Sequence, residues 1–327
     1  MDKKASDVVK YTLSFALAGV MVWLAFRKVE WSSFWEGLRQ TRWAWVILFF
    51  AASLLALFFR TLRWQALLKP LGGKNSKMLI WDANNVGNLA NVVLPGSGEF
   101  VRCGYLSGGA AGYEKVFGTV VMERICDVAA IVVLFVTALV FGWEKFGTFF
   151  RESIIAPITE GMNFSLWWIL LAVVAVLGAA GWAVWHFRGS SKFCARIVSG
   201  IQGFLQGFVS FSKMDRKWLF VLYTVLIWLM YILMFWSILK AMPALEGLSF
   251  IDAVFLSAVG NIASVIPVPG GIGAYHYLIA LTLSSLYGVP WETGLLNATL
   301  NHELHAVLII LLGIVSYFLL TLRKKKD

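Results

Sequence analysis

Two breaks that contain proline and glycine interrupt an otherwise apolar chain, and they constrain its fold more than any other feature. The first reads NVVLPGSGEFVR over residues 91–102, and the second reads SVIPVPGGIGAYH over residues 264–276. A break of this kind frees backbone N–H and C=O groups, which hydrocarbon cannot satisfy at a cost of several kcal/mol each. Breaks within a membrane protein are therefore expected inside the protein or beside a wet cavity.

The composition indicates that this chain folds in lipid. Of its 327 residues, 59% are hydrophobic and 14% are charged, whereas soluble domains are about 45–50% apolar and about 25% charged. The mean hydropathy of +0.76 agrees with this, and the 16 tryptophans suit interfacial belts. The formal charge of +10 comes from cations between the apolar segments, so it indicates topology and not nucleic-acid binding. Cys103, Cys126 and Cys194 are widely spaced and predict no disulfide framework.

Six segments are long enough to cross the hydrocarbon, which takes roughly 20 residues. They are residues 8–26, 43–62, 115–142, 166–187, 217–240 and 302–322. Two further apolar segments, 77–112 and 250–289, carry the breaks and predict helix–break–helix hairpins. Residues 28–42 and 192–212 have patterns typical of short interfacial helices. We expect the N-terminal run to be a retained helix, because it lacks a clear signal-peptide cleavage site.

The charges between these segments orient them in the membrane. Loops 60–77 and 188–217 and the C-terminal tail are rich in Lys and Arg, whereas 143–164 and 241–249 are not. The positive-inside rule makes the basic regions cytoplasmic and predicts that both termini are cytoplasmic. This assignment requires each broken segment to return to the side it entered, or to cross twice.

The two breaks resemble each other. GNLANVVLPGSGEF begins at Gly87 and GNIASVIPVPGGIGAY begins at Gly260, and each unit has one spanning segment before it and one after it. We therefore predict an all-α polytopic membrane protein, with about six full transmembrane helices plus two broken, re-entrant hairpins in an inverted-topology repeat. Such repeats are typical of transporters whose site lies near the midplane.

This arrangement makes residues 1–327 a single membrane domain. Residues 8–42 form its N-terminal helix and interfacial segment, and residues 143–216 link the repeats through one transmembrane helix and an amphipathic helix. Repeat 1 spans 43–142 with its hairpin at 77–112, and repeat 2 spans 217–322 with its hairpin at 250–289.

Polar residues around the first break are the main candidates for a substrate site. Asn84, Asn88 and Asn91 share one helix face, where they either line a groove for a lipid headgroup or hydrogen-bond to neighbouring helices. Glu99 and Arg102 follow the break three residues apart and are expected to pair.

Charged residues also lie deep in the third long apolar segment. Glu123 and Asp127 share a face, and Arg124 can reach Asp127 at i+3. Charges this deep mark either a substrate path or a buried structural network. Arg60 and Arg63 end the second span, where they act as snorkelling anchors or capture a headgroup phosphate.

The second break contributes a smaller set of candidates. We expect Asn261, Tyr275 and His276 to bind substrate. The alternative role for Tyr275 and His276 is to hydrogen-bond a carbonyl freed at the break. The NHELH run holds His302 and His305 three residues apart, so it does not form the HExxH zinc motif. We therefore expect no metal, no cofactor and no catalytic residue.

Four motifs carry a resemblance to a known family. RTLRWQALL, NLANVVLPGSGEFVRCGYL, ERICD and PVPGGIGAYH resemble the lysylphosphatidylglycerol synthase transmembrane-region family, the flippase-like part of the multiple peptide resistance factor. The resemblance covers roughly residues 10–322. It implies a membrane part that moves aminoacylated phosphatidylglycerol between leaflets, while a separate cytosolic domain makes that lipid. This sequence ends shortly after its last span, so we do not expect the synthase activity.

The sequence thus predicts a flippase-like transporter that moves a phospholipid, aminoacylated or anionic, or a lipid-linked headgroup between leaflets. The alternative is an integral-membrane enzyme or an accessory subunit of envelope lipid or polyprenyl-glycan synthesis. The expected location is a bacterial or archaeal cytoplasmic (inner) membrane. The expected partners are membrane lipids and no nucleic acid, with a homo-oligomer or a separate lipid-synthesis enzyme left open.

Overall fold

A computed structural model describes most of the chain. It covers residues 16–27, 29–72, 75–94, 96–107, 112–147, 181–187, 214–263 and 268–324, with residues 151, 171, 175, 178, 179 and 212 as isolated positions. Every regular element in these ranges is a helix, as the composition predicts. Several predicted features lie outside the described residues, including half of segment 166–187, almost all of 192–212, and Pro95 of the first break.

Four helices in the described part are long and apolar enough to cross a membrane. They are α3 (Ala44–Leu68), α6 (Tyr113–Phe141), α11 (Lys217–Ala241) and α14 (Trp291–Lys324). They coincide with four of the six spans that the hydropathy pattern predicts. Of the other two, the first is described only as the shorter apolar helix Ala16–Phe26.

Helix α14 begins at Trp291, well before the predicted start at residue 302. The residues that the prediction left out, 291–301, include Glu292, Asn297 and Asn301, and polar residues lower the hydropathy of a window. The helix includes them because polar side chains in this part of α14 find partners within the protein, as Asn301 does by donating to the carbonyl oxygen of Asn297. His302 hydrogen-bonds to the carbonyl oxygen of Gly270, and His305 lies 2.7 Å from the Ser53 hydroxyl.

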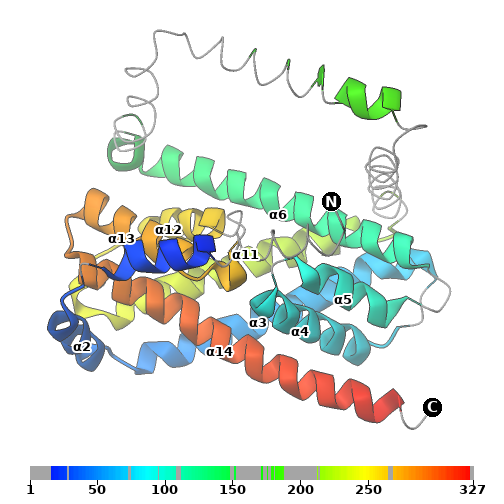
Figure 1. The fold of residues 1–327 in the computed structure, drawn as a ribbon, viewed down its shortest axis with the longest axis horizontal. Helices are drawn as coiled ribbons and strands as arrows, with labels where there is room; N and C mark the ends of the chain where they lie inside the picture. The colour runs from blue at the N-terminus through cyan, green and yellow to red at the C-terminus, as the bar shows by residue number, and fades with distance from the viewer. Residues whose placement is uncertain are drawn as a thin grey trace.

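Each broken segment folds as two helices joined at its break. The first pair is α4 (Lys77–Val93) and α5 (Ser97–Leu106), and the second is α12 (Phe250–Ile262) and α13 (Ala274–Tyr287). Figure 1 shows α4 and α5 toward the end of the molecule that carries the C-terminus, and α12 and α13 toward the end that carries α2 (Trp31–Gln40). Helix α14 passes both pairs and packs against α13 and α4.

Glycines allow the two arms of each hairpin to approach closely. A Cβ atom at Gly98 would lie 2.0 Å from the carbonyl oxygen of Gly87, so α4 and α5 touch backbone to backbone. A Cβ atom at Gly260 would lie 2.7 Å from the Tyr275 ring, where α12 meets α13. Gly87 and Gly260 head the two matching sequence units, and each contacts the return arm of its own hairpin.

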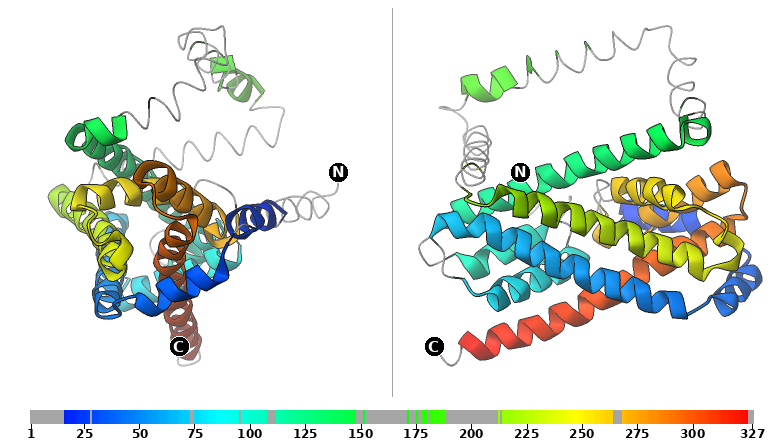
Figure 2. Two further views of the ribbon diagram at one scale, coloured as in Figure 1. Left: turned by 90° about the vertical axis from the view of Figure 1, so that its left-hand side faces the viewer. Right: turned by 180° about the vertical axis from the view of Figure 1, so that it is seen from behind.

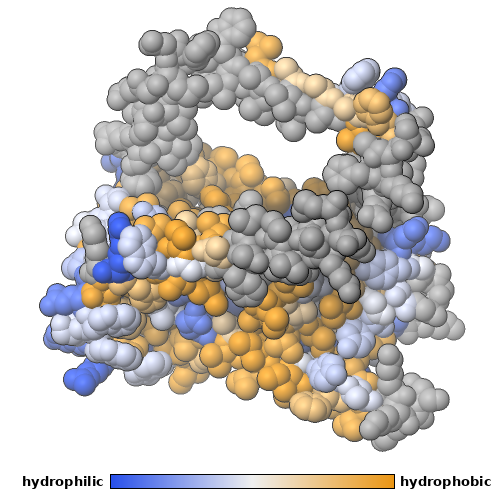
Figure 3. Space-filling model, viewed as in Figure 1, coloured by the Kyte–Doolittle hydropathy of each residue, from blue (hydrophilic) through white to orange (hydrophobic). Residues whose placement is uncertain are grey.

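The long helices enclose the hairpins and present an apolar surface. Helices α3 and α11 run side by side (Figure 2), and α3 buries the small residues Ala52, Ser53 and Ala56, which let helices approach closely in lipid. Orange hydrophobic surface covers the middle of the molecule, while blue hydrophilic residues gather at its two ends (Figure 3). Helix α2 lies at one end with Trp31 and Trp35 exposed, as expected of an interfacial helix.

Four short helical elements complete the described fold. Element η1 (Lys69–Leu71) follows α3, and element η5 (Pro243–Leu245) follows α11. The π-helical turn η2 (Trp143–Gly147) follows α6. Residues Pro269–Gly271 (η7) lie in the second break, between α12 and α13. This last element positions the functional site.

Candidate functional site

The two breaks meet inside the protein. Element η7 of the second break packs against α4, whose last turn leads into the first break. A Cβ atom at Gly270 would lie 3.7 Å from the carbonyl oxygen of Val92, an ordinary van der Waals distance. Backbone groups freed at both breaks are thereby brought to one region of the molecule.

Side chains satisfy the backbone at the first break. Gly96 adopts a left-handed conformation with φ +76° and starts α5. The side-chain carbonyl oxygen of Asn91 accepts a 2.7 Å hydrogen bond from the backbone N–H of Gly98, and the Ser97 hydroxyl donates a 3.0 Å hydrogen bond to the backbone carbonyl of Ala90. Asn91 therefore acts as the cap of the returning helix, which is one of the two uses predicted for the asparagine face.

The second break is held by helices from both ends of the chain. His302 Nε2 lies 2.7 Å from the carbonyl oxygen of Gly270, so α14 satisfies a backbone group of η7. Gly273 has φ +83°, and a Cβ atom there would lie 2.6 Å from the backbone nitrogen of Val22. The N-terminal helix thus lies directly against this break. The sequence assigns the bond to a freed carbonyl to Tyr275 or His276, whereas the structure gives it to His302.

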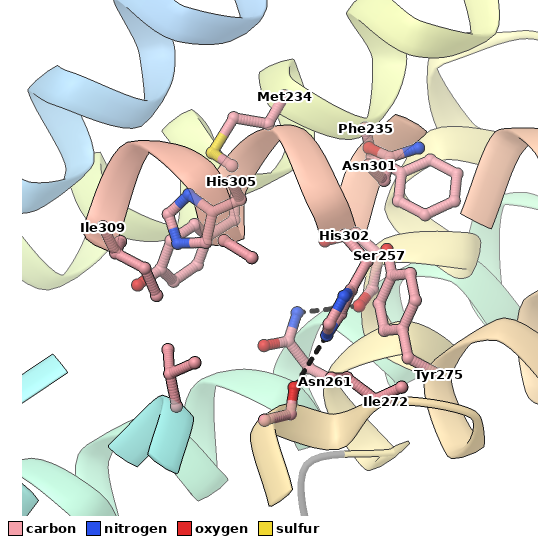
Figure 4. A pocket seen from close by; sticks show the side chains of 14 residues that line it. Met234, Phe235, Ser257, Asn261, Ile272, Tyr275, Asn301, His302, His305 and Ile309 are labelled. Carbon is pink, nitrogen blue, oxygen red and sulfur yellow. Dashed lines mark hydrogen bonds between the residues drawn. The ribbon is translucent and has the colours of Figure 1, made fainter. Parts of the chain in front are cut away.

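A cavity of about 260 Å³ lies where the two breaks meet. Figure 4 shows polar side chains from α12, α13 and α14 around it. At about 30 Å³ per water, it has room for several water molecules. Its lining residues are Val92, Tyr231, Met234, Phe235, Ser257, Asn261, Gly270, Ile272, Tyr275, Asn301, His302, His305, Ala306 and Ile309.

A network of charged residues joins α3, α5 and α6. The Arg63 guanidinium binds both Asp127 oxygens, at 2.7 and 3.2 Å, and its Nε lies 3.4 Å from Glu123. Arg102 binds the other oxygen of Glu123 at 2.8 Å and stacks over Trp64. The Arg63, Arg102 and Glu123 side chains are at most 5% exposed, so both ion pairs of Glu123 are sealed from solvent, whereas the Asp127 side chain is 21% exposed.

The ion pairs differ from those that the local spacing predicts. Glu99 pairs with Arg124 of α6 at 2.5 Å, not with Arg102, and Asp127 pairs with Arg63, not with Arg124. Residues at i and i+3 are neighbours on a helix surface, but here each guanidinium points away from its own helix into the interface with the next. Tertiary packing therefore decides which charges pair.

Arg60 lies on α3, one helical turn before Arg63, and interacts electrostatically with Glu123 and Asp127 of the network. Its guanidinium has one long hydrogen bond, 3.5 Å to the Asn88 side chain, and no salt bridge to a described carboxylate. It is close enough to Tyr231 and His305, which both line the cavity, for direct electrostatic interaction. Four arginines (60, 63, 102, 124) face three acids (99, 123, 127), which leaves one unbalanced positive charge.

The structure divides the predicted site residues into three groups. Asn261 and Tyr275 line the cavity, whereas Arg60 and Asn88 contact each other and are not among its lining residues. A second group belongs to the charged network or, in the case of Asn91, caps α5 beside it: Arg63, Asn84, Asn91, Glu99, Arg102, Glu123, Arg124 and Asp127. Asn84 joins the network by accepting a 3.0 Å hydrogen bond from Arg102. His276 is buried behind Tyr275 and faces Glu303.

Sequence reasoning missed several polar groups of the cavity. Tyr231, Ser257, Asn301 and His305 line it, although none was a candidate. The NHELH run was the available signal, because polar residues inside a span usually face the protein interior. Together with Arg60, these hydroxyl, amide and imidazole groups can hydrogen-bond a polar, anionic group held between the two breaks.

Comparison with known proteins agrees with the fold and with the motifs at the two breaks. The model of the family described as "Lysylphosphatidylglycerol synthase TM region" matches residues 11–313. No curated protein and no solved structure gives a significant match. The match covers α3, α6, α11, both hairpins and α14 as far as residue 313, and it includes every residue that lines the cavity. This chain is a membrane protein that belongs to the lysylphosphatidylglycerol synthase TM region family.

Proposed function

We propose that this protein moves phospholipids between the two leaflets of a membrane and binds the phosphate of the headgroup in the cavity between the breaks. The observation that carries this proposal is the position of Arg60. It interacts electrostatically with Tyr231 and His305, which line a polar cavity inside an otherwise apolar protein, and its guanidinium has no salt bridge to a described carboxylate. The family's printed description concerns a phospholipid product and agrees with a lipid substrate.

A phosphate diester matches the charge of this site. It carries one negative charge, which balances the one positive charge left over by the arginine network. Arginine binds phosphate well because its planar guanidinium offers two parallel N–H donors. Anionic and aminoacylated phospholipids share this phosphate, so both are candidate substrates. Asn88, Asn261 and Tyr275 are the further residues that we propose contact the headgroup.

The sealed ion pairs have a different role in this proposal. Arg63, Arg102, Glu123 and Asp127 neutralise one another, and together they fix α3 against α5 and α6. Arg60 lies one helical turn from Arg63 on α3, so this framework holds its guanidinium beside the cavity. We infer that the network orients the binding residue and does not itself meet the lipid.

The hairpins supply a route to the cavity from each side of the membrane. We infer that they form an inverted-topology repeat, with α4 and α5 entered from the cytoplasm and α12 and α13 from outside, as the positive-inside rule predicts. Their positions toward opposite ends of the molecule support this inference, as do the equivalent contacts of Gly87 and Gly260. In transporters of this design the substrate site lies near the midplane, between the repeats.

Lipid exchange in proteoliposomes tests the proposal. The purified chain is reconstituted with a fluorescent phosphatidylglycerol, and dithionite added outside destroys the label in the outer leaflet. We expect the wild-type protein to expose inner-leaflet label faster than empty liposomes do. Arg60→Gln should slow this exchange roughly tenfold to a hundredfold, because a hydrogen bond to a charged group contributes about 1.5–3 kcal/mol.

Arg39→Gln provides the matched control, because Arg39 is exposed on α2, away from the cavity. It should exchange lipid at the wild-type rate. Equal rates for Arg60→Gln and Arg39→Gln would remove Arg60 from the site, and a wild-type rate equal to that of empty liposomes would contradict lipid movement. Covalent conversion of the lipid by the pure protein would favour the alternative, an integral-membrane enzyme.

A further inference from the structure

Two histidines and a glutamate converge where the second break meets α14. His276 is in the first turn of α13, and His302 and Glu303 are consecutive residues of α14. His302 Nδ1 lies 2.9 Å and His276 Nε2 lies 3.5 Å from the same oxygen of Glu303. One ligand atom from each of the three residues lies within 4.8 Å of the other two.

The hydrogen-bond pattern leaves a lone pair of His302 directed at the carboxylate. A carbonyl oxygen can only accept, so the 2.7 Å contact between His302 Nε2 and the Gly270 oxygen fixes the proton on Nε2 (Figure 4). In the neutral ring, Nδ1 is then an acceptor that faces another acceptor, the Glu303 oxygen, at 2.9 Å. Two acceptors this close need a positive ion between them, which is either a proton or a metal ion.

Three features favour a metal ion over a proton alone. First, a second imidazole nitrogen, from His276, faces the same oxygen. Second, ligands of a tetrahedral zinc ion at about 2.0–2.2 Å lie about 3.3–3.6 Å apart; the His276–Glu303 distance of 3.5 Å matches this range, and the His302–Glu303 distance of 2.9 Å requires a small outward shift of the carboxylate. Third, a metal-binding histidine usually donates its other N–H to a carboxylate or backbone carbonyl, as His302 does to Gly270.

We propose that His276, His302 and Glu303 bind a divalent metal ion of the zinc class. Two imidazoles and a carboxylate suit zinc and its neighbours in the transition series, and three protein ligands leave one coordination position open. The His276 side chain is 3% exposed and the Glu303 side chain 45% exposed, so the carboxylate is free to adjust while the buried imidazole is fixed. This inference does not depend on lipid movement.

Bound metal would fasten the second break to α14. His276 follows the break by three residues, whereas His302 already holds the break through Gly270. One ion bound by both histidines would therefore tie α13, the broken backbone and α14 together. It would also place a second positive charge beside the cavity, because His302 lines it.

Metal retention by the purified full-length protein tests the site. The chain in detergent is stripped with chelator, equilibrated with zinc chloride, dialysed and analysed for metal by mass spectrometry. We expect about one zinc ion per chain, and with cobalt in its place an intense visible absorption typical of four-coordinate Co²⁺. Glu303→Gln and His302→Gln should weaken zinc binding about tenfold or more, since even outer-shell changes cost 10–100-fold.

His305→Gln is the matched control. His305 lies on the same helix and lines the same cavity, but its ring contacts Ser53 and not the cluster. It should retain zinc like the wild-type protein. Glu303 is half exposed, so its variant should fold even if His302→Gln does not, and melting in chelator checks this. The proposal is overturned if the wild-type protein retains no zinc, or if Glu303→Gln retains as much zinc as the wild type. It is also overturned if His305→Gln loses as much zinc as Glu303→Gln does.

Discussion

Glu123 and Arg124 are neighbours on α6, yet their side chains have different environments. Glu123 is 3% exposed and has two arginine partners, whereas Arg124 is 47% exposed and has one partner, Glu99. Glu123→Gln should therefore destabilise the protein by about 3–5 kcal/mol, because it leaves buried guanidinium charge uncompensated. Arg124→Gln should cost less than about 1 kcal/mol, as exposed ion pairs do. Thermal melting in detergent measures both, and equal melting temperatures would contradict a sealed network.

The sequence predicts that Glu123 and Asp127 lie deep in the protein, but not that Arg63 is buried beside them, that Arg124 is half exposed, or how the charges pair. A charge inside an apolar segment is visible in the sequence, so Glu123 and Asp127 could be identified from position alone. Their partner Arg63 lies on another helix, and the local spacing suggests Arg124 instead. Helix periodicity gives the direction of a side chain on its own helix, whereas the pairing depends on how separate helices pack. Arg60 is ambiguous for the same reason until the positions of the acids are known.

The first hairpin depends on the close approach of its arms. A methyl group at Gly98 would lie 2.0 Å from the backbone oxygen of Gly87, and backbone cannot move aside as a flexible side chain can. Gly98→Ala should separate α4 from α5, lower the melting temperature and slow lipid exchange, with a typical overpacking cost of about 1–3 kcal/mol. Melting and the proteoliposome assay on one preparation measure these effects.

Gly104 gives the control within the same helix, because no other group lies within 4 Å of its Cβ position. Gly104→Ala should be neutral or stabilise α5 by about 0.5–1 kcal/mol, since glycine is costly in a helix interior. If both alanine variants melt together, the hairpin does not require the close approach.

The sequence predicted which helices and hairpins exist better than it predicted the residues at which each helix begins and ends. Proline and glycine mark both breaks clearly, and the hairpins form on either side of them. The start of α14 was placed too late, because polar residues such as Asn297 and Asn301 lower the hydropathy of its first turns, and hydropathy cannot show that both are buried inside the protein. The cavity where the two breaks meet has residues from α11 and α14 that no local pattern identifies.

For the whole molecule, the inverted arrangement predicts that its two ends face opposite sides of the membrane. Lys69 follows α3 at the end that holds α4 and α5, and Gly247 follows α11 at the opposite end. In a background without the three native cysteines, Lys69→Cys should react only from the cytoplasm and Gly247→Cys only from outside, with an impermeant maleimide. Both positions are exposed, so access does not limit the reaction. Labelling of both from one side would refute the inverted arrangement.

The central claim is that a lipid headgroup occupies the cavity between the two breaks, and photocrosslinking tests this most directly. A phosphatidylglycerol with a photoreactive headgroup is irradiated with the reconstituted protein, and crosslinked peptides are identified by mass spectrometry. We expect crosslinks to cavity residues such as Tyr231, Asn261 and Tyr275, and we expect both unlabelled phosphatidylglycerol and the Arg60→Gln substitution to reduce them. Crosslinks confined to exposed positions on α6 such as Val132 and Val136, and unaffected by Arg60→Gln, would contradict it.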